Sequence, residues 1–246
     1  MIALRRAPER QRELNGGLAI WRAFDLERGG TDVLAGGFGA LENLSEGSIA
    51  PGGNAWSFGS RDAEFVTYVA DGVVARSDPE TRPRLMQAGE FGHLAVGRGS
   101  QLSEANASPA ISARVFRLRF TSPAPRGVRQ CDGRRFTAAE RRGHLRVVAS
   151  PDGRQGSLLM GQSVLVFSAL LDPGHHVVHA LLPGRMAWLH VVCGSGMLGD
   201  LLLSEGDGVG FADERAVAFT AEDVAELLLV DLPDEALPPR GATLQP

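Results

Sequence analysis

Glycine and proline interrupt this chain so often that few long helices can form. Its 246 residues include 31 Gly and 14 Pro. The apolar runs between them are short, about four to eight residues, which is typical of β-strands bounded by turns. Turn signals return every ~8–12 residues, a spacing typical of sandwiches and barrels. The sequence therefore predicts an all-β protein.

The segment 114–120 shows the clearest strand alternation. Phe116, Leu118 and Phe120 share one face of a strand, and Val115, Arg117 and Arg119 share the other. We expect the apolar face to lie in a core, and the arginine face to lie in solvent or at a seam between domains.

Helical signals are weak. Thr137 and Glu140 have the spacing of a capping box, but Gly143 limits the helix to about one turn. The segment 223–229 has some helical character, yet its β-branched flanks and the nearby Pro233 favour a final strand over 225–231.

The chain divides into two halves. Residues 121–143 are rich in Pro, Gly and Arg and carry the least strand pattern, so we expect a linker there. This predicts an N-terminal barrel over 1–120 and a C-terminal barrel over 144–246, whose tail from Pro238 onward is expected to be mobile.

Charge and composition exclude several classes of protein. The net charge of −4 provides no basic field for nucleic acid or an anionic membrane. No apolar window approaches the ~18 residues of a membrane span, and the first residues do not resemble a signal peptide. Cys131 and Cys193 are far apart and form no CxxC motif, so we expect reduced thiols in a cytoplasmic protein.

Three stretches carry the most information about family, namely 61–72 (RDAEFVTYVADG), 87–91 (QAGEF) and 96–106 (VGRGSQLSEAN). They resemble the pirin family. In that family the first barrel contains His-Pro-His-Arg, followed after two residues by Glu and then by Thr-Tyr-Val and a Gly. An Ala-Gly-Glu or Ala-Gly-Asp turn and Gly-x-Gly-x-x-His-Ser-Glu follow. The opening 1–7, the turn at 150–158 and the closing 228–233 match the bacterial branch, so the resemblance covers nearly the whole chain.

The resemblance implies a bicupin, two stacked antiparallel β-barrels of the jelly-roll (double-stranded β-helix) type. In such proteins the first strands often cross to the other barrel. It also implies a site for iron, nickel or copper in the first barrel, and activities that include quercetin 2,3-dioxygenase.

The residues at the implied metal positions have changed. The family's paired histidines fall on Phe58 and Ser60, the third histidine falls on Leu102, and the fourth ligand, Glu104, is retained. Phe and Leu donate no lone pair, and one carboxylate cannot hold a transition metal against water. We therefore expect a degenerate site with no metal cofactor and no catalytic residue. Restoring histidine at the three positions is expected to recover metal binding.

A buried Glu104 without its metal needs another partner, because burying a bare carboxylate is costly. A neighbouring Ser, Arg or water, a cationic or hydroxylated ligand, or a role as a base are the open alternatives. Phe58 and Leu102 are expected to plug the former cavity. If a cavity remains, Trp56, Tyr68 and Glu104 are its candidate lining residues.

Four histidines form a second candidate cluster, His175, His176, His179 and His190. On a strand, His175 and His179 share one face and His176 points to the other, so at most two could chelate from that segment. A surface turn with His179 in the wall of the second barrel is the competing interpretation.

We expect a non-catalytic, pirin-like bicupin that binds an unknown protein or small molecule, without direct contact to nucleic acid or membrane. A metal-dependent quercetin 2,3-dioxygenase is the alternative function. A small-molecule binder that uses the emptied N-terminal barrel is the third.

Overall fold

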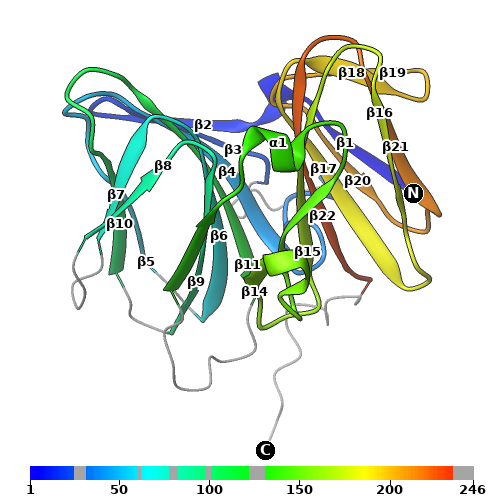
Figure 1. Cartoon of the computed structure of the whole chain (residues 1–246), viewed down its shortest axis with the longest axis horizontal. Helices are drawn as coiled ribbons and strands as arrows, with labels where there is room; N and C mark the ends of the chain where they lie inside the picture. Colours follow the sequence, from blue (N-terminus) through cyan, green and yellow to red (C-terminus); the bar gives the residue numbers. More distant parts are fainter. Residues whose placement is uncertain (25–31, 60–61, 78–82, 98–100, 122–130, 235–246) are drawn as a thin grey trace, which may run out of the picture.

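The computed structural model describes residues 1–24, 32–59, 62–77, 83–97, 101–121 and 131–234. Strands dominate these residues, and α1 (Ala138–Arg141) is a single helical turn. Two barrels stand side by side, each built from a seven-stranded and a four-stranded sheet (Figure 1). The prediction of an all-β, two-barrel protein is confirmed.

The first barrel takes most of its strands from the N-terminal half. Its seven-stranded sheet runs in the order β12 (Cys131–Arg135), β9 (Glu90–Val96), β6 (Ala63–Asp71), β11 (Ala113–Thr121), β4 (Leu41–Ile49), β3 (Leu18–Arg22) and β2 (Gln11–Asn15). Its four-stranded sheet runs β5 (Trp56–Gly59), β10 (Gln101–Asn106), β7 (Val73–Ser77) and β8 (Arg84–Gln87).

The second barrel repeats this plan. Its large sheet runs β1 (Ile2–Arg5), β20 (Gly208–Phe211), β17 (Arg185–Cys193), β22 (Ala225–Pro233), β15 (Leu165–Leu171), β13 (Arg146–Ser150) and β14 (Leu158–Leu159). Its small sheet runs β16 (His176–Ala180), β21 (Ala216–Ala221), β18 (Ser195–Leu198) and β19 (Leu201–Ser204). Short 3₁₀ turns lie at Ala7–Glu9 and Arg154–Gly156.

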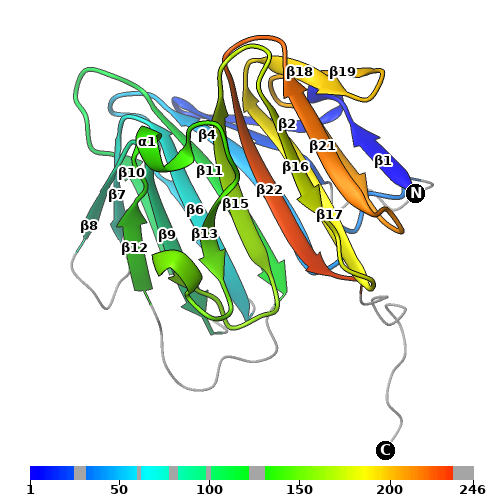
Figure 2. The ribbon, with the colours of Figure 1, turned by 45° about the vertical axis from the view of Figure 1, so that its right-hand side comes forward.

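The two large sheets face each other across a shared apolar core (Figure 2). Tyr68 and Phe116 of the first barrel belong to the same buried cluster as Trp188 and Leu228 of the second. The edge of Phe24 lies against Trp188, with ring centroids 4.7 Å apart. Because each aromatic side chain buries a large apolar area, this contact holds the barrels together.

β11 explains the alternation seen in the sequence. Phe116, Leu118 and Phe120 lie in the core between the barrels, as an apolar face should. The expectation that the arginine face lies in solvent or at a seam is wrong, because Arg117 is 5% exposed inside the first barrel. Burial there requires compensating charge, which other strands of the barrel supply.

The sheets divide the chain differently from the predicted domains in two places. β1 lies within the predicted N-terminal unit but pairs with β20 of the second barrel, which confirms the crossing of the first strands expected from the resemblance. β12 lies within the predicted linker, yet it pairs with β9 and extends the first barrel. Residues 122–130 of that linker and the tail 235–246 lie outside the described residues.

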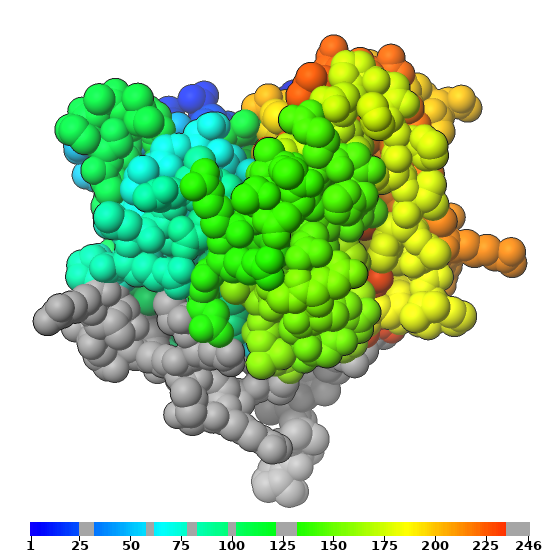
Figure 3. All heavy atoms as spheres, viewed as in Figure 1, coloured from blue at the N-terminus to red at the C-terminus, as the bar shows by residue number. Residues whose placement is uncertain are grey.

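Two local predictions are confirmed. Thr137 and Glu140 form the capping box of α1, and β22 is the last strand of the described residues. On the face seen in Figure 3, the green residues from β12 to β14 lie between the cyan residues of the first barrel and the yellow residues of the second. No helix in the described parts of the chain is long and apolar enough to cross a membrane.

Candidate functional site

The interior of the first barrel contains two apolar clusters with a polar layer between them. Along β6 the inward positions are Phe65, Thr67 and Val69, and only Thr67 is polar. Phe65 belongs to one apolar cluster and Val69 to the other. Side chains that alternate along strands line one face of a sheet, so the polar layer is a cross-section of the barrel at the level of Thr67.

Glu104 on β10 is the centre of this layer, and its side chain is fully buried. Its Oε1 accepts hydrogen bonds from Nε and Nη2 of Arg76, at 3.0 and 2.8 Å, and from Oγ1 of Thr67, at 3.3 Å. Its Oε2 accepts a hydrogen bond from Nη2 of Arg117 at 2.6 Å. Of the alternatives left open by the sequence, an arginine partner is therefore the one observed, and there are two.

The charges in this layer control its titration. Burial alone would raise the pKa of Glu104, but the charges and hydrogen bonds of Arg117 and Arg76 outweigh burial and lower that pKa to about 2. Burial lowers the pKa of Arg117 to about 10, and the positive charges of Arg76 and Arg22 act in the same direction as burial. Glu104 and Arg117 are therefore both ionised at neutral pH, and two buried guanidinium groups share one buried carboxylate.

Trp56 on β5 packs tightly inside the barrel. Its ring is 3.6 Å from the guanidinium carbon of Arg117, a stacked cation–π contact. The ring also lies against Gly47 of β4, where a Cβ atom would stand 2.5 Å from the indole ring. Since Gly47 and Arg117 both lie against the indole, and Trp56 is only 5% exposed, the ring has little surface left to stack on a ligand.

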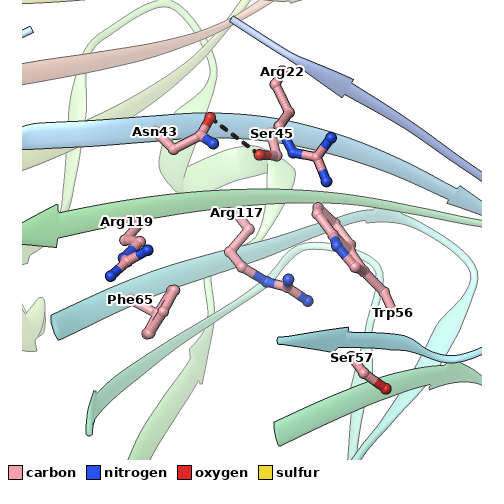
Figure 4. A pocket seen from close by; sticks show the side chains of 8 residues that line it. All are labelled: Arg22, Asn43, Ser45, Trp56, Ser57, Phe65, Arg117 and Arg119. Atoms are coloured by element: carbon pink, nitrogen blue, oxygen red, sulfur yellow. Dashed lines mark hydrogen bonds between the residues drawn. The ribbon is translucent and has the colours of Figure 1, made fainter. Parts of the chain in front are cut away.

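A cavity of about 170 Å³ lies beside Arg117 (Figure 4). Among the described residues, its lining includes three arginines and no acidic side chain: Arg22, Asn43, Ser45, Trp56, Ser57, Phe65, Arg117 and Arg119. Arginine, aromatic and small polar side chains together suit an anion with a small apolar part.

The four positions that the resemblance relates to metal binding fall on β5 and β10 or next to them. Leu102 is 3% exposed and packs in an apolar cluster with Phe65 and Leu94. The backbone of Phe58 pairs with that of Leu102 across β5 and β10. Ser60 and the side chain of Phe58 lie outside the described residues. The packing around Leu102 leaves apolar side chains where a metal would need donor atoms.

A divalent metal fits this set of residues poorly. Both oxygens of Glu104 are engaged by guanidinium groups, and Leu102 offers no lone pair. The positive charges of Arg76 and Arg117 would repel a metal cation in this buried site. Among the residues that the structure describes, no group of three or more His, Cys, Asp or Glu side chains could hold a metal ion.

Tyr68 lies away from this cavity, in the contact between the barrels. Its hydroxyl donates to Oε1 of Glu226 at 2.5 Å and accepts from Nη1 of Arg141 at 3.1 Å. Arg141 also donates to Glu226 at 2.6 Å and to Ser168 at 3.0 Å. Burial, followed by the charge of Glu226, raises the pKa of Tyr68 well above its ordinary range. This cluster connects β6, α1, β15 and β22, which makes it a structural link rather than part of the cavity.

The candidate histidines are dispersed. His175 and His176 are exposed at the start of β16. His179 shares a hydrogen bond with Asp231 at 2.7 Å. His190 is buried at the contact between the barrels, near Phe116, and burial with nearby arginine charges lowers its pKa to about 3. These residues do not converge on one point.

Sequence reasoning missed Arg76 and misplaced Arg117. Both carry a detectable signal, since Arg76 shares a strand face with the apolar Val74, and Arg117 shares one with Val115. An arginine on an inward strand face requires a buried acid. The identity of that acid depends on strand pairing, which one sequence does not reveal.

The fold and this interior site define the chain as a bicupin, a protein of two cupin barrels packed against each other. Residues 147–232 match the family model described as "Quercetinase C-terminal cupin domain". The quercetin 2,3-dioxygenase of Escherichia coli (strain K12) is 31% identical over 234 residues, which cover 95% of this chain and 99% of that protein. The chain therefore belongs to the pirin family of bicupins.

Other relatives agree. A pirin-like protein of Caulobacter vibrioides is 27% identical over 195 residues, which cover 79% of this chain and 84% of that protein. The crystal structure of the bacterial pirin YhhW from Escherichia coli in complex with nickel(II) superposes with a TM-score of 0.85 at 29% identity. That superposition covers 96% of this chain and all of that one. The fold is thus shared with a relative that was crystallised with a metal.

Proposed function

We propose that this protein is a metal-free, non-catalytic member of the pirin family that acts as a binding protein. The observation that carries the proposal is the occupation of Glu104 by two arginines. One carboxylate oxygen accepts three hydrogen bonds, and the other accepts one from Arg117. A metal would have to displace charged, buried partners from the one ligand that the resemblance leaves in place.

Charge supports the same conclusion. A divalent cation with one carboxylate carries a net charge of +1, and so do Arg76 and Arg117 with Glu104. The guanidinium pair therefore substitutes for the charge of a metal, which gives a physical reason for Glu104 to remain after three histidines are replaced. Without a metal, the barrel would otherwise bury an uncompensated carboxylate.

The size of the cavity argues against the dioxygenase alternative. Pockets that bury drug-sized molecules usually measure about 300–1,000 Å³, and quercetin is a three-ring molecule of that class. The cavity beside Arg117 measures about 170 Å³. Its volume suits a smaller molecule, which supports the third expected function, a small-molecule binder.

Oxygen uptake with quercetin tests the non-catalytic part of the proposal. The purified protein would be incubated with Fe(II), Ni(II) or Cu(II), and the quercetin 2,3-dioxygenase of Escherichia coli would serve as positive control. We expect uptake at the rate of a protein-free blank with every metal. Uptake that depends on an added metal and approaches the rate of the control would refute the proposal.

The proposal places the protein in the cytoplasm. Cys193 is a free thiol, which is consistent with a reducing compartment. We propose that the protein binds a small molecule rather than nucleic acid or a membrane. Its net charge is −4, and the cationic groups of the cavity are gathered inside a barrel.

A further inference from the structure

The cavity of the first barrel contains a row of three residues, in which a serine lies between two arginines. Arg22 on β3 lies opposite Ser45 on β4, and Ser45 lies opposite Arg117 on β11. The backbones of Arg22 and Arg117 are therefore two strand spacings apart, roughly 10 Å. All three side chains line the cavity (Figure 4), so a gap above the short side chain of Ser45 separates two long cationic ones.

The charges around this gap favour an anion. In the described part of the chain, Arg22, Arg117 and Arg119 line the cavity and no acidic side chain does. Arg119 is paired with Glu42 at 2.9 Å, so the two cations of the row are Arg22 and Arg117. Arg117 shares its carboxylate partner, Glu104, with a second guanidinium. The positive charge of Arg22 also lowers the pKa of Arg117, after burial and the charge of Arg76, so Arg22 lies close enough to Arg117 to repel it. A negative charge between them would relieve that repulsion.

Arg22 is available to such an anion. Its ion pair with Glu13 at 2.7 Å is open to solvent, with side-chain exposures of 26% and 49%. Ion pairs of this kind contribute about 0–1 kcal/mol, so a ligand can compete with Glu13 for the guanidinium. Arg117, by contrast, is held in place by Glu104 and Trp56, and it provides a fixed point of attachment.

We propose that this cavity binds a small organic carboxylate, with the carboxylate group above Ser45 and between Arg22 and Arg117. The proposal deepens the proposed binding function and rests on the absence of a metal. A cavity of about 150 Å³ accepts a benzene ring, and about 170 Å³ is present here. An acid of the size of benzoate therefore fits, with its carbon skeleton against Phe65.

Calorimetric titration of the whole chain with sodium benzoate tests the site, and benzamide is the neutral probe of the same shape. We expect benzoate to bind at one site per chain at low salt, and benzamide to show no binding. Inorganic phosphate separates an organic acid site from a general oxyanion site, and we expect it to bind at least about tenfold more weakly than benzoate.

Two variants test the row. Arg22→Gln removes one of the two cationic groups, and we expect benzoate affinity to fall about tenfold or more. Glu13→Gln removes the exposed competitor of the carboxylate, and we expect affinity to rise about two- to threefold. Arg142→Gln is the matched control, because it removes an exposed arginine paired with Asp172 at the second barrel, and affinity should stay within about twofold.

Equal binding of benzoate and benzamide, unchanged affinity in Arg22→Gln, or phosphate as tight as benzoate would each overturn the carboxylate site. These failures are distinct from failure of the proposed function. If the chain is metal-free but does not bind benzoate, only the carboxylate site is refuted. If the chain contains stoichiometric metal, the proposed function is refuted as well.

Discussion

Glu104 and Arg76 lie directly opposite each other on β10 and β7, and the guanidinium of Arg76 donates two hydrogen bonds to one carboxylate oxygen of Glu104. This pairing, completed by Arg117 from the facing sheet, lies in the polar layer of the first barrel. Because the resemblance relates Glu104 to the family's metal site, we propose that its partners determine what that barrel can bind.

Replacing the shared carboxylate should destabilise the fold. Glu104→Gln leaves two buried guanidinium groups without an anion, and we expect a loss of about 3–5 kcal/mol in the free energy of unfolding. Urea denaturation monitored by circular dichroism measures this quantity. Glu13→Gln is the matched control, since Glu13 also pairs with an arginine but is half exposed; it should cost less than about 1 kcal/mol. Similar small losses in both variants would contradict the buried-cluster interpretation.

Acid should reveal the same cluster. The pKa of Glu104 is lowered from its ordinary value of 4.5 to about 2 in the folded chain. A lowered carboxylate pKa contributes stability that is fully present above pH 4.5 and is lost as the pH falls toward 2. Over that window the wild type should lose about 3 kcal/mol more than Glu104→Gln. Parallel stability curves for the two proteins would show that Glu104 does not titrate this way.

Tyr68 provides a direct optical test of the contact between the barrels, because it is the one tyrosine in the sequence. Burial and the charge of Glu226 raise its pKa above the ordinary value of 10.0. Absorbance near 295 nm should therefore show no phenolate as the folded protein passes through pH 10, and the signal should appear once urea unfolds the chain. Ionisation of Tyr68 near pH 10 in the folded protein would contradict its burial and place the side chain in solvent.

Much of the fold follows from local pattern. The alternation on β11, the capping box at Thr137 and the final strand β22 all depend on residues close together in sequence. β1 and β12 could not be assigned to their sheets from local pattern, and the crossing of β1 was expected only from the resemblance to bicupins. Their partners, β20 and β9, are set by long-range pairing that leaves little trace in so short a strand.

The candidate site was predictable only in part. The pattern of the family identified Glu104 and Leu102 as informative positions. It did not identify Arg76, whose meaning depends on lying opposite Glu104, or Arg22, whose meaning depends on sharing a row with Arg117. Strand register creates both relationships, and register is a property of the folded sheet.

The expectation that three histidines recover metal binding is revised, because Glu104 is bound to two arginines that the sequence did not reveal as its partners. Changing Phe58, Ser60 and Leu102 to His supplies imidazoles but leaves Glu104 bound to Arg76 and Arg117. We expect this variant to bind no nickel in a calorimetric titration. Adding Arg76→Met and Arg117→Met frees Glu104 and removes the opposing charges, and nickel binding should then appear. Nickel binding by the three-histidine variant would show that the arginines do not exclude a metal.

The metal content of the wild-type chain tests the central claim most directly. The protein would be produced in medium supplemented with iron, nickel and copper, purified without chelators and measured by inductively coupled plasma mass spectrometry, alongside the Escherichia coli pirin YhhW, which has been crystallised with nickel(II). Because we propose that Arg76 and Arg117 take the place of a cation at Glu104, we predict less than about 0.1 metal ions per chain. A content near one iron, nickel or copper ion per chain would contradict the claim.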